Sequence, residues 1–201
     1  MFLQPCLFCS RAAEGCVCEG CARELDAAAS LISSAVPFAD VAFTVFEYGQ
    51  KKVRRAVFQL KRRADARLAD TLARFLARET KDYTLGALCV TYVPRRLSQK
   101  WRQGTDQARE IARAFAKHAG LPCVRLLVRR GVSRRQHDLE KEARAANVHG
   151  KFRAKGPLCG TVVLIDDIIT TGATASEASR VLRAAGAERV VVLAVSRGGE
   201  V

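Results

Sequence analysis

The sequence predicts an α/β fold, a doubly wound parallel sheet with a small N-terminal zinc-binding module. Apolar runs of strand length alternate with amphipathic segments from residue 41 onward, which is typical of a parallel sheet covered by helices on both faces. One such run, 162–165, leads into two aspartates and a Thr/Gly-rich turn, an order that places a ligand at the carboxyl edge of the sheet. Two Cys-x2-Cys pairs near the N-terminus predict the metal module.

The bulk composition is that of an ordinary globular protein. The 201 residues are enough for one domain with a small addition, and a hydrophobic content of 49% suits a packed core. The apolar runs are shorter than the roughly 18 residues that a membrane-spanning helix requires, so we expect no membrane insertion. The N-terminus lacks a basic start followed by an apolar stretch, so we expect no secretory signal and a cytoplasmic location.

Cysteines are concentrated at the N-terminus, where five of the eight lie within the first 21 residues. The two pairs, separated by eight residues, are Cys6, Cys9, Cys18 and Cys21. Four thiolates at this spacing predict a closed structural zinc site, and metal binding would supply the folding energy of a segment too short to bury a core. Cys16 is an alternative ligand with poorer spacing, and free or redox-active thiols are the competing interpretation. We assign residues 1–36 to this module and 37–201 to the main domain.

Strands and helices are expected to alternate through the main domain. The expected strands lie at 41–46, 88–93, 124–128, 161–165 and 189–195. Helices are expected where apolar residues recur every three or four positions, at 51–61, around 68–76, around 108–116, at 136–146 and at 175–185. Cys89, Cys123 and Cys159 lie in or near the strands, and we expect them in the core.

Basic residues exceed acidic ones and give a net charge of +14. They cluster at Lys51-Lys52-Val53-Arg54-Arg55, Lys61-Arg62-Arg63, Arg95-Arg96 with Lys100 and Arg102, and Arg129-Arg130 with Arg134-Arg135. Such an excess predicts attraction to polyanions, either a nucleic acid or a highly phosphorylated small ligand. Solvated arginines on an ordinary basic protein are the alternative.

The strongest functional signal is the run Val162-Val163-Leu164-Ile165-Asp166-Asp167-Ile168-Ile169-Thr170-Thr171-Gly172-Ala173-Thr174. The start of a helix offers unpaired N–H groups and a positive partial charge, so the turn predicts a phosphate site that Gly172 lets the backbone approach closely. Asp166 and Asp167 would repel that phosphate, and we expect them to bind ribose hydroxyls instead. The run therefore predicts a 5-phosphoribosyl site. Its phosphate-binding residues would be Thr170, Thr171, Gly172, Ala173 and Thr174.

A second basic turn, Tyr92-Val-Pro-Arg95-Arg96, follows another expected strand and should reach the same edge of the sheet. We expect Arg95 and Arg96 to bind a pyrophosphate there. The polar segment 98–107 contains glycine and precedes a helix, which predicts a mobile lid whose Lys100 and Arg102 would neutralise a departing pyrophosphate. An ordinary surface connection is the alternative.

The run from Val162 to Thr174 resembles the motif with which type I phosphoribosyltransferases bind 5-phosphoribosyl 1-diphosphate (PRPP). Across nearly the whole chain, the order of motifs resembles the ComF family of competence proteins. These motifs are the two cysteine pairs, Val93-Pro94-Arg95, Arg102-Gln-Gly104-Thr-Asp-Gln107, Gln136…Arg144…Asn147-Val148-His-Gly150-Lys-Phe152 and the PRPP motif. One departure is Gly-Thr-Asp-Gln at 104–107, where the family has Gly-Phe-Asn-Gln, so that an aromatic residue able to stack on a base is missing.

The resemblance implies a type I phosphoribosyltransferase fold that binds PRPP or a related ligand with Mg²⁺, and a role in DNA uptake during natural transformation. Asp166, Asp167, Lys100 and Arg102 would then be the catalytic residues of a phosphoribosyl transfer. Because one fold hosts many functions, two alternatives stay open. One is a non-catalytic component that binds single-stranded DNA through its basic clusters, and the other is a component whose finger docks on a competence helicase or translocase.

Overall fold

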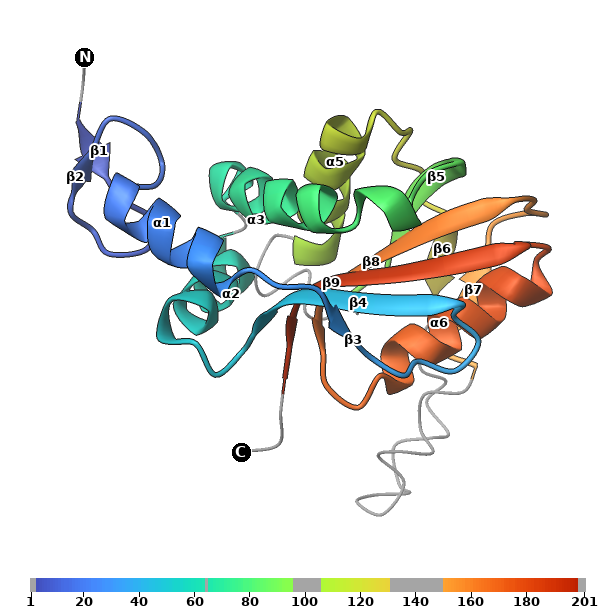
Figure 1. Ribbon diagram of the computed structural model, residues 1–201. Helices are drawn as coiled ribbons and strands as arrows, with labels where there is room; N and C mark the ends of the chain where they lie inside the picture. Colours follow the sequence, from blue (N-terminus) through green and yellow to red (C-terminus); the bar gives the residue numbers. More distant parts are fainter. Residues whose placement is uncertain (1–2, 64, 96–105, 131–149, 199–201) are drawn as a thin grey trace.

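The centre of the protein, in a computed structural model that describes residues 3–63, 65–95, 106–130 and 150–198, is a five-stranded sheet in the order β3-β4-β9-β8-β5 (Figure 1). Its strands are β3 (Ile32–Ser33), β4 (Val41–Glu47), β5 (Ala87–Tyr92), β8 (Thr161–Ile169) and β9 (Arg189–Arg197). Neighbours among β4, β9, β8 and β5 are parallel, and β3 pairs antiparallel with β4 at one edge. The interior strands are apolar along their length because both of their faces are covered.

Helices cover both faces of this sheet. They are α2 (Lys51–Arg63), α3 (Ala66–Glu79), α5 (Gln107–Ala119) and α6 (Ala173–Ala184). In Figure 1, α3 and α5 lie on one side of the sheet and α6 on the other. The first layer packs around Phe46 and Phe115, and the second around Leu164 and Leu182. The predicted doubly wound α/β class is confirmed.

Smaller elements complete the main domain. They are the 3-10 turn η1 (Lys81–Tyr83) and the antiparallel pair β6 (Leu127–Arg129) and β7 (Phe152–Ala154). The strand predicted at 124–128 is shorter and later than expected, because only Leu127–Arg129 pairs with β7, whereas the chain before it meets β5 only through an isolated bridge between Cys123 and Val90. The helix predicted at 136–146 lies outside the described residues. In the part of the chain that the structure describes, no helix combines the length and the apolar character needed to cross a membrane.

The N-terminal module consists of β1 (Gln4–Pro5), β2 (Ala12–Ala13) and α1 (Glu19–Ala28). Figure 1 shows it at one end of the molecule, beside α2. Its buried Phe8 and Leu25 belong to the same hydrophobic core as α2 and α3. The boundary after residue 36 stays a prediction, and β3, which precedes it, already pairs with the main sheet.

The two central strands extend further than their neighbour β5. Pairing between β5 and β8 ends at Tyr92 and Ile165, followed by a last hydrogen bond from the Val93 N–H to the Ile165 carbonyl. β8 continues through both aspartates to Ile169, paired there with β9 alone. The strand is therefore longer than the predicted 161–165, because β9 keeps its backbone hydrogen bonded. Because β5 ends first, no strand lies beside the last residues of β8 on that side. This leaves a crevice next to the two aspartates, as expected for a ligand site in this class of sheet.

Candidate functional site

A pocket of about 250 Å³ opens where β5 ends and β8 continues. Its lining comprises Lys61, Val93, Pro94, Arg95, Gln107, Ala108, Arg129 and residues 166–175. The acid pair, the predicted phosphate turn and Arg95 thus meet in one cavity, although they come from two separate parts of the sequence. Arg96, Lys100 and Arg102, and most of the predicted lid at 98–107, lie outside the described residues.

The two aspartates are held by their own backbone. The Asp167 N–H donates to Oδ1 of Asp166 at 2.8 Å, and the Ile168 N–H donates to Oδ1 of Asp167 at 2.9 Å. The second carboxylate oxygen of Asp167 lies 3.8 Å from Nζ of Lys61, which α2 brings to the pocket. One oxygen of each acid is therefore fixed, and the other oxygen of Asp167 already has a cation beside it.

Asp166 lies deep in the protein and is only partly exposed, at the pocket. Burial, followed by the charge of Asp167, raises the pKa of Asp166 well above its usual range. The Asp167 N–H and the Lys61 ammonium act in the opposite direction but do not compensate fully. An ionised carboxylate at this position therefore weakens the fold and needs a ligand or a cation to balance it.

Because the ionised form of Asp166 is unfavourable in the folded protein, we predict that Asp166→Asn stabilises the protein at neutral pH. An acid whose pKa is raised by folding stabilises the folded state while it is protonated, and loses that contribution as the pH rises from its unfolded pKa through its folded pKa. We expect Asp166→Asn to raise the melting temperature at pH 7 and to have a smaller effect at pH 4. Thermal unfolding of both proteins at the two pH values measures this, and a lower melting temperature of the variant at pH 7 would contradict it.

The turn after β8 has the geometry of an anion site. Gly172 has φ +72°, in the left-handed region, so a residue with a side chain would be strained there. Helical bonding in α6 begins with the Ser176 N–H to the Gly172 carbonyl, which leaves the first-turn N–H groups without a partner within the helix. The side chains of Thr170 and Thr171 are exposed at this end. The turn can therefore bind a phosphate through N–H groups, hydroxyls and the helix dipole.

Three further polar residues line the pocket that were not among the predicted site residues: Lys61, for which the sequence left this position open, Gln107, the last residue of the predicted lid segment, and Arg129. Nη1 of Arg129 lies 3.5 Å from the carbonyl of Pro94 and so supports the turn after β5. Gln107 is fully buried, and neither atom of its side-chain amide has a hydrogen-bond partner among the described residues. The sequence signals for these residues were the basic clusters that contain Lys61 and Arg129 and the ComF-like motif at 102–107 that contains Gln107. None of these signals determines where the side chain lies in the folded protein.

The two N-terminal cysteine pairs come together as predicted. The Sγ atoms of Cys6, Cys9, Cys18 and Cys21 all lie within 4.8 Å of one another. Cys9 and Cys18 are 3.6 Å apart, sulfur to sulfur. A tetrahedral zinc ion with Zn–S bonds of about 2.3 Å requires sulfur separations of about 3.8 Å, so the donor set and its dimensions fit zinc. Cys16 belongs to the same segment but not to this group.

The protonation of these thiols differs within the cluster. Burial would raise the pKa of Cys6, but the backbone N–H groups of Cys18, Phe8 and Cys9 outweigh it and lower that pKa to about 6. Burial and the neighbouring thiols raise the pKa of Cys21 to about 12. Cys6 is therefore mostly a thiolate at pH 7, whereas Cys21 must release a proton to bind a metal.

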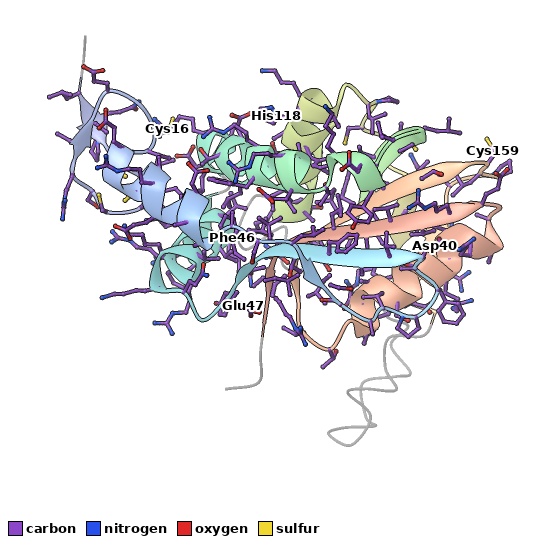
Figure 2. All side chains as sticks on the ribbon, viewed as in Figure 1. Cys16, Asp40, Phe46, Glu47, His118 and Cys159 are labelled. Carbon is purple, nitrogen blue, oxygen red and sulfur yellow. The ribbon has the colours of Figure 1, made fainter. Side chains whose placement is uncertain are left out.

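The three other cysteines lie elsewhere. Cys89 and Cys123 are half-buried, and Cys159 is exposed. Figure 2 shows Cys159 at the opposite end of the molecule from Cys16 in the module. The prediction of a core position is wrong for Cys159, because it lies in the turn before β8 and not in the strand.

The fold and the site define a doubly wound α/β protein with a polar pocket at the carboxyl edge of its sheet and a four-cysteine cluster able to hold a metal. DNA utilization protein YhgH of Salmonella typhi is 30% identical over 151 residues, covering 70% of this chain and 65% of that protein. The Escherichia coli (strain K12) protein of the same name is 29% identical over the same coverage. Competence protein F of Haemophilus influenzae is 30% identical over 105 residues, covering 49% of this chain and 45% of that protein.

The chain is a homologue of these DNA utilization and competence proteins, which confirms its resemblance to the ComF competence proteins. It spans less than two thirds of the length of those relatives, 65% for YhgH of Salmonella typhi. No protein-family model matches the chain. Among solved structures, the allosteric regulatory enzyme of purine biosynthesis is 26% identical with a TM-score of 0.41, covering 62% of this chain and 24% of the enzyme.

Proposed function

We propose that this protein binds PRPP, or a related 5-phosphoribosyl ligand, together with Mg²⁺ and transfers the phosphoribosyl group in a pathway of DNA uptake or utilization. The observation that carries the proposal is that Asp166, Asp167, Arg95 and the turn at 170–174 line one pocket. The names of the relatives, DNA utilization protein and competence protein, support the biological process.

Each part of the pocket has a proposed role. The turn at 170–174 would hold the 5-phosphate, and the two aspartates would accept hydrogen bonds from the ribose hydroxyls. Arg95 would bind the pyrophosphate, together with Arg96, Lys100 and Arg102, which are proposed on the sequence alone. Carboxylate oxygens are ligands that suit Mg²⁺. The ammonium of Lys61, 3.8 Å from Oδ2 of Asp167, already balances part of the negative charge of the acid pair. When bound, Mg²⁺ would supply positive charge against the pyrophosphate.

The proposed reaction is a substitution at the anomeric carbon of the ribose. The bond from that carbon to the pyrophosphate oxygen breaks, and pyrophosphate leaves with the electron pair. The nucleophile of the acceptor forms the new bond to the same carbon. Negative charge develops on the leaving pyrophosphate, so a guanidinium group fixed beside it, such as that of Arg95, would stabilise the transition state.

Calorimetric titration of the protein with PRPP and Mg²⁺ tests the proposal. We expect saturable heat from the wild type and a loss of affinity of roughly 100-fold for Ala173→Asp, because a carboxylate placed in the phosphate turn repels the phosphate by several kcal/mol. Ala184→Asp is the matched control, since Ala184 is exposed at the other end of the same helix. An absence of heat from the wild type, or equal affinity in all three proteins, would contradict the proposal.

A second candidate function, binding of single-stranded DNA, is favoured by the outer face of α2. Phe58 is 55% exposed there, and the guanidinium carbon of Arg62 lies 5.7 Å from the centre of its ring. Lys51 and Arg54 are exposed on the same helix. Exposed aromatic side chains among cations bind single strands by stacking on bases and pairing with phosphates.

For this candidate we expect the affinity for an oligothymidylate to fall steeply with salt, because phosphate contacts release counterions. Phe58→Ala should weaken binding by about 1–3 kcal/mol, the value of one stacked base. Phe38→Ala is the control, because Phe38 is 54% exposed and lies outside this helix. Fluorescence anisotropy at several salt concentrations measures both effects, and an affinity that is independent of salt would exclude this function.

A further inference from the structure

One helix, α2, contacts both the cysteine module and the pocket. Near its start, Lys52 forms an ion pair with Glu24 of α1, and Nη2 of Arg55 donates to Oγ of Ser10 at 3.2 Å. Near its end, Nζ of Lys61 lies 3.8 Å from Oδ2 of Asp167 in the pocket. Figure 1 shows α1 and α2 next to each other at the end of the molecule where the N-terminus lies.

The buried face of α2 packs against both the cysteine module and the main domain. Val53, Ala56, Val57 and Leu60 are almost completely buried. They share one hydrophobic core with Phe8 and Leu25 of the module and with α3. Loss of the module would therefore expose apolar surface of α2 and remove two of its polar contacts. Because a 13-residue helix is about 20 Å long and its hydrogen bonds hold it together as one unit, a shift of its first turns would also move Lys61 at its last turn.

The cysteine cluster itself lies close to α2. Lys52 of α2 pairs with Glu24, which lies one helical turn after the predicted metal ligand Cys21 in α1. The helix that carries Cys21 and Glu24 is therefore joined to α2 by an ion pair as well as by the shared core.

At the other end of α2, Lys61 is placed to contact a ligand. Its side chain is 37% exposed and that of Asp167 is 19% exposed, so the pair is open to the pocket but partly desolvated. PRPP carries phosphate groups, and the ammonium of Lys61 lies beside the acid that would hold the ribose, in the lining of the same pocket. A cation at this place neutralises Asp167 and attracts the anionic oxygens of the ligand.

We propose that Lys61 binds the phosphoribosyl ligand and that its position depends on the metal-loaded module, so that zinc binding and PRPP binding reinforce each other through α2. The inference rests on the proposed function of the pocket. Thermodynamic linkage makes the effect reciprocal: zinc strengthens PRPP binding by the same factor by which PRPP strengthens zinc binding. Coupling between two sites is typically about 5-fold to 150-fold in affinity.

The first measurement compares full-length protein in its zinc-loaded and chelator-stripped forms. We expect the calorimetric Kd for PRPP with Mg²⁺ to be at least about 5-fold weaker after stripping. We also expect PRPP to lower the fraction of zinc that a chromogenic chelator removes at equilibrium. The second readout does not depend on any activity of the protein.

Variants separate the coupling from general unfolding. Ser10→Gly/Glu24→Gln removes the hydroxyl that accepts from Arg55 and the charge that pairs with Lys52, and it leaves all four cysteines, so zinc should stay bound while the Kd for PRPP rises. Gly suits position 10 because Ser10 has φ +65°. Lys61→Met should weaken PRPP binding and remove its dependence on zinc, and Lys61→Arg should restore part of both. Arg62→Met is the matched control, because Arg62 contacts Phe58 and does not line the pocket.

The outcomes distinguish the two proposals. PRPP binding by the wild type that is unaffected by zinc removal, by Ser10→Gly/Glu24→Gln or by Lys61→Met would overturn the coupling and leave the proposed function standing. An absence of PRPP binding by the zinc-loaded wild type would overturn the proposed function and the coupling together.

Discussion

The double variant Asp166→Asn/Asp167→Asn is expected to bind PRPP at least about 100-fold more weakly than the wild type while keeping its fold. Hydrogen bonds to charged groups contribute about 1.5–3 kcal/mol each, so the loss of two charged acceptors corresponds to about 3 kcal/mol or more. Asparagine is nearly isosteric with aspartate and keeps an Oδ1 that can accept the N–H bonds now made to Asp166 and Asp167. The change therefore removes charge with little change of shape.

Calorimetry with Mg²⁺ measures the affinity, and thermal unfolding establishes that the variant is folded. Because the charge of Asp166 weakens the fold at neutral pH, the variant should melt no lower than the wild type. Asp82→Asn is the control for a lost negative charge, since Asp82 is exposed in η1 and does not line the pocket. An affinity of the double variant equal to that of Asp82→Asn would show that the acid pair does not hold the ligand.

The unit from β8 to α6 could be predicted from the sequence because its signals are local. The apolar run, the acids and the turn with Gly172 follow one another within a few residues, and backbone geometry determines how such a turn connects a strand to a helix. The end of the strand could not be predicted in the same way. Whether Asp166 and Asp167 belong to β8 depends on hydrogen bonds from β9, which lies later in the chain and extends to Arg197.

The cysteine cluster was also predictable, because its signal is local. Each Cys-x2-Cys pair places two sulfurs on one turn, and the short segment between the pairs lets the two turns meet around one metal ion. Lys61, Gln107 and Arg129 show the opposite case. Each reaches the pocket through the packing of a separate element, α2, α5 or β6, and no spacing in the sequence encodes that packing. Arg96, Lys100 and Arg102 lie outside the described residues, so their roles stay predictions.

Removal of the metal is the second change for which we expect a large effect. We expect one zinc ion per chain in the purified protein, and we expect Cys21→Ser to lose it. Structural zinc contributes an apparent free energy of about 10–16 kcal/mol in zinc-finger peptides at pH 7, more than a segment of this length can obtain from its own core. The module should therefore unfold without the metal. Because Phe8 and Leu25 cover the core around α2 and α3, the melting temperature of the whole protein should fall as well.

Cys16→Ser is the matched control for this experiment, because Cys16 lies in the same segment but outside the four-sulfur group. Cys159→Ser controls for a lost exposed thiol at the other end of the molecule (Figure 2). Elemental analysis and thermal unfolding should give wild-type values for both controls. If Cys16→Ser lost as much zinc as Cys21→Ser, the metal would be held by a different set of thiols from the one in the structure.

The pH dependence of zinc binding gives an independent check on the same cluster. Cys6, with a pKa of about 6, is already mostly ionised at pH 7, whereas Cys21, with a pKa of about 12, must give up its proton when the metal binds. Zinc binding should therefore release protons at pH 7, and the apparent zinc affinity should rise as the pH is raised. Titrations in buffers of different ionisation enthalpy measure the number of protons released. Zinc binding without proton release would mean that the buried thiol of Cys21 is not a ligand, because only its thiolate can bind the metal.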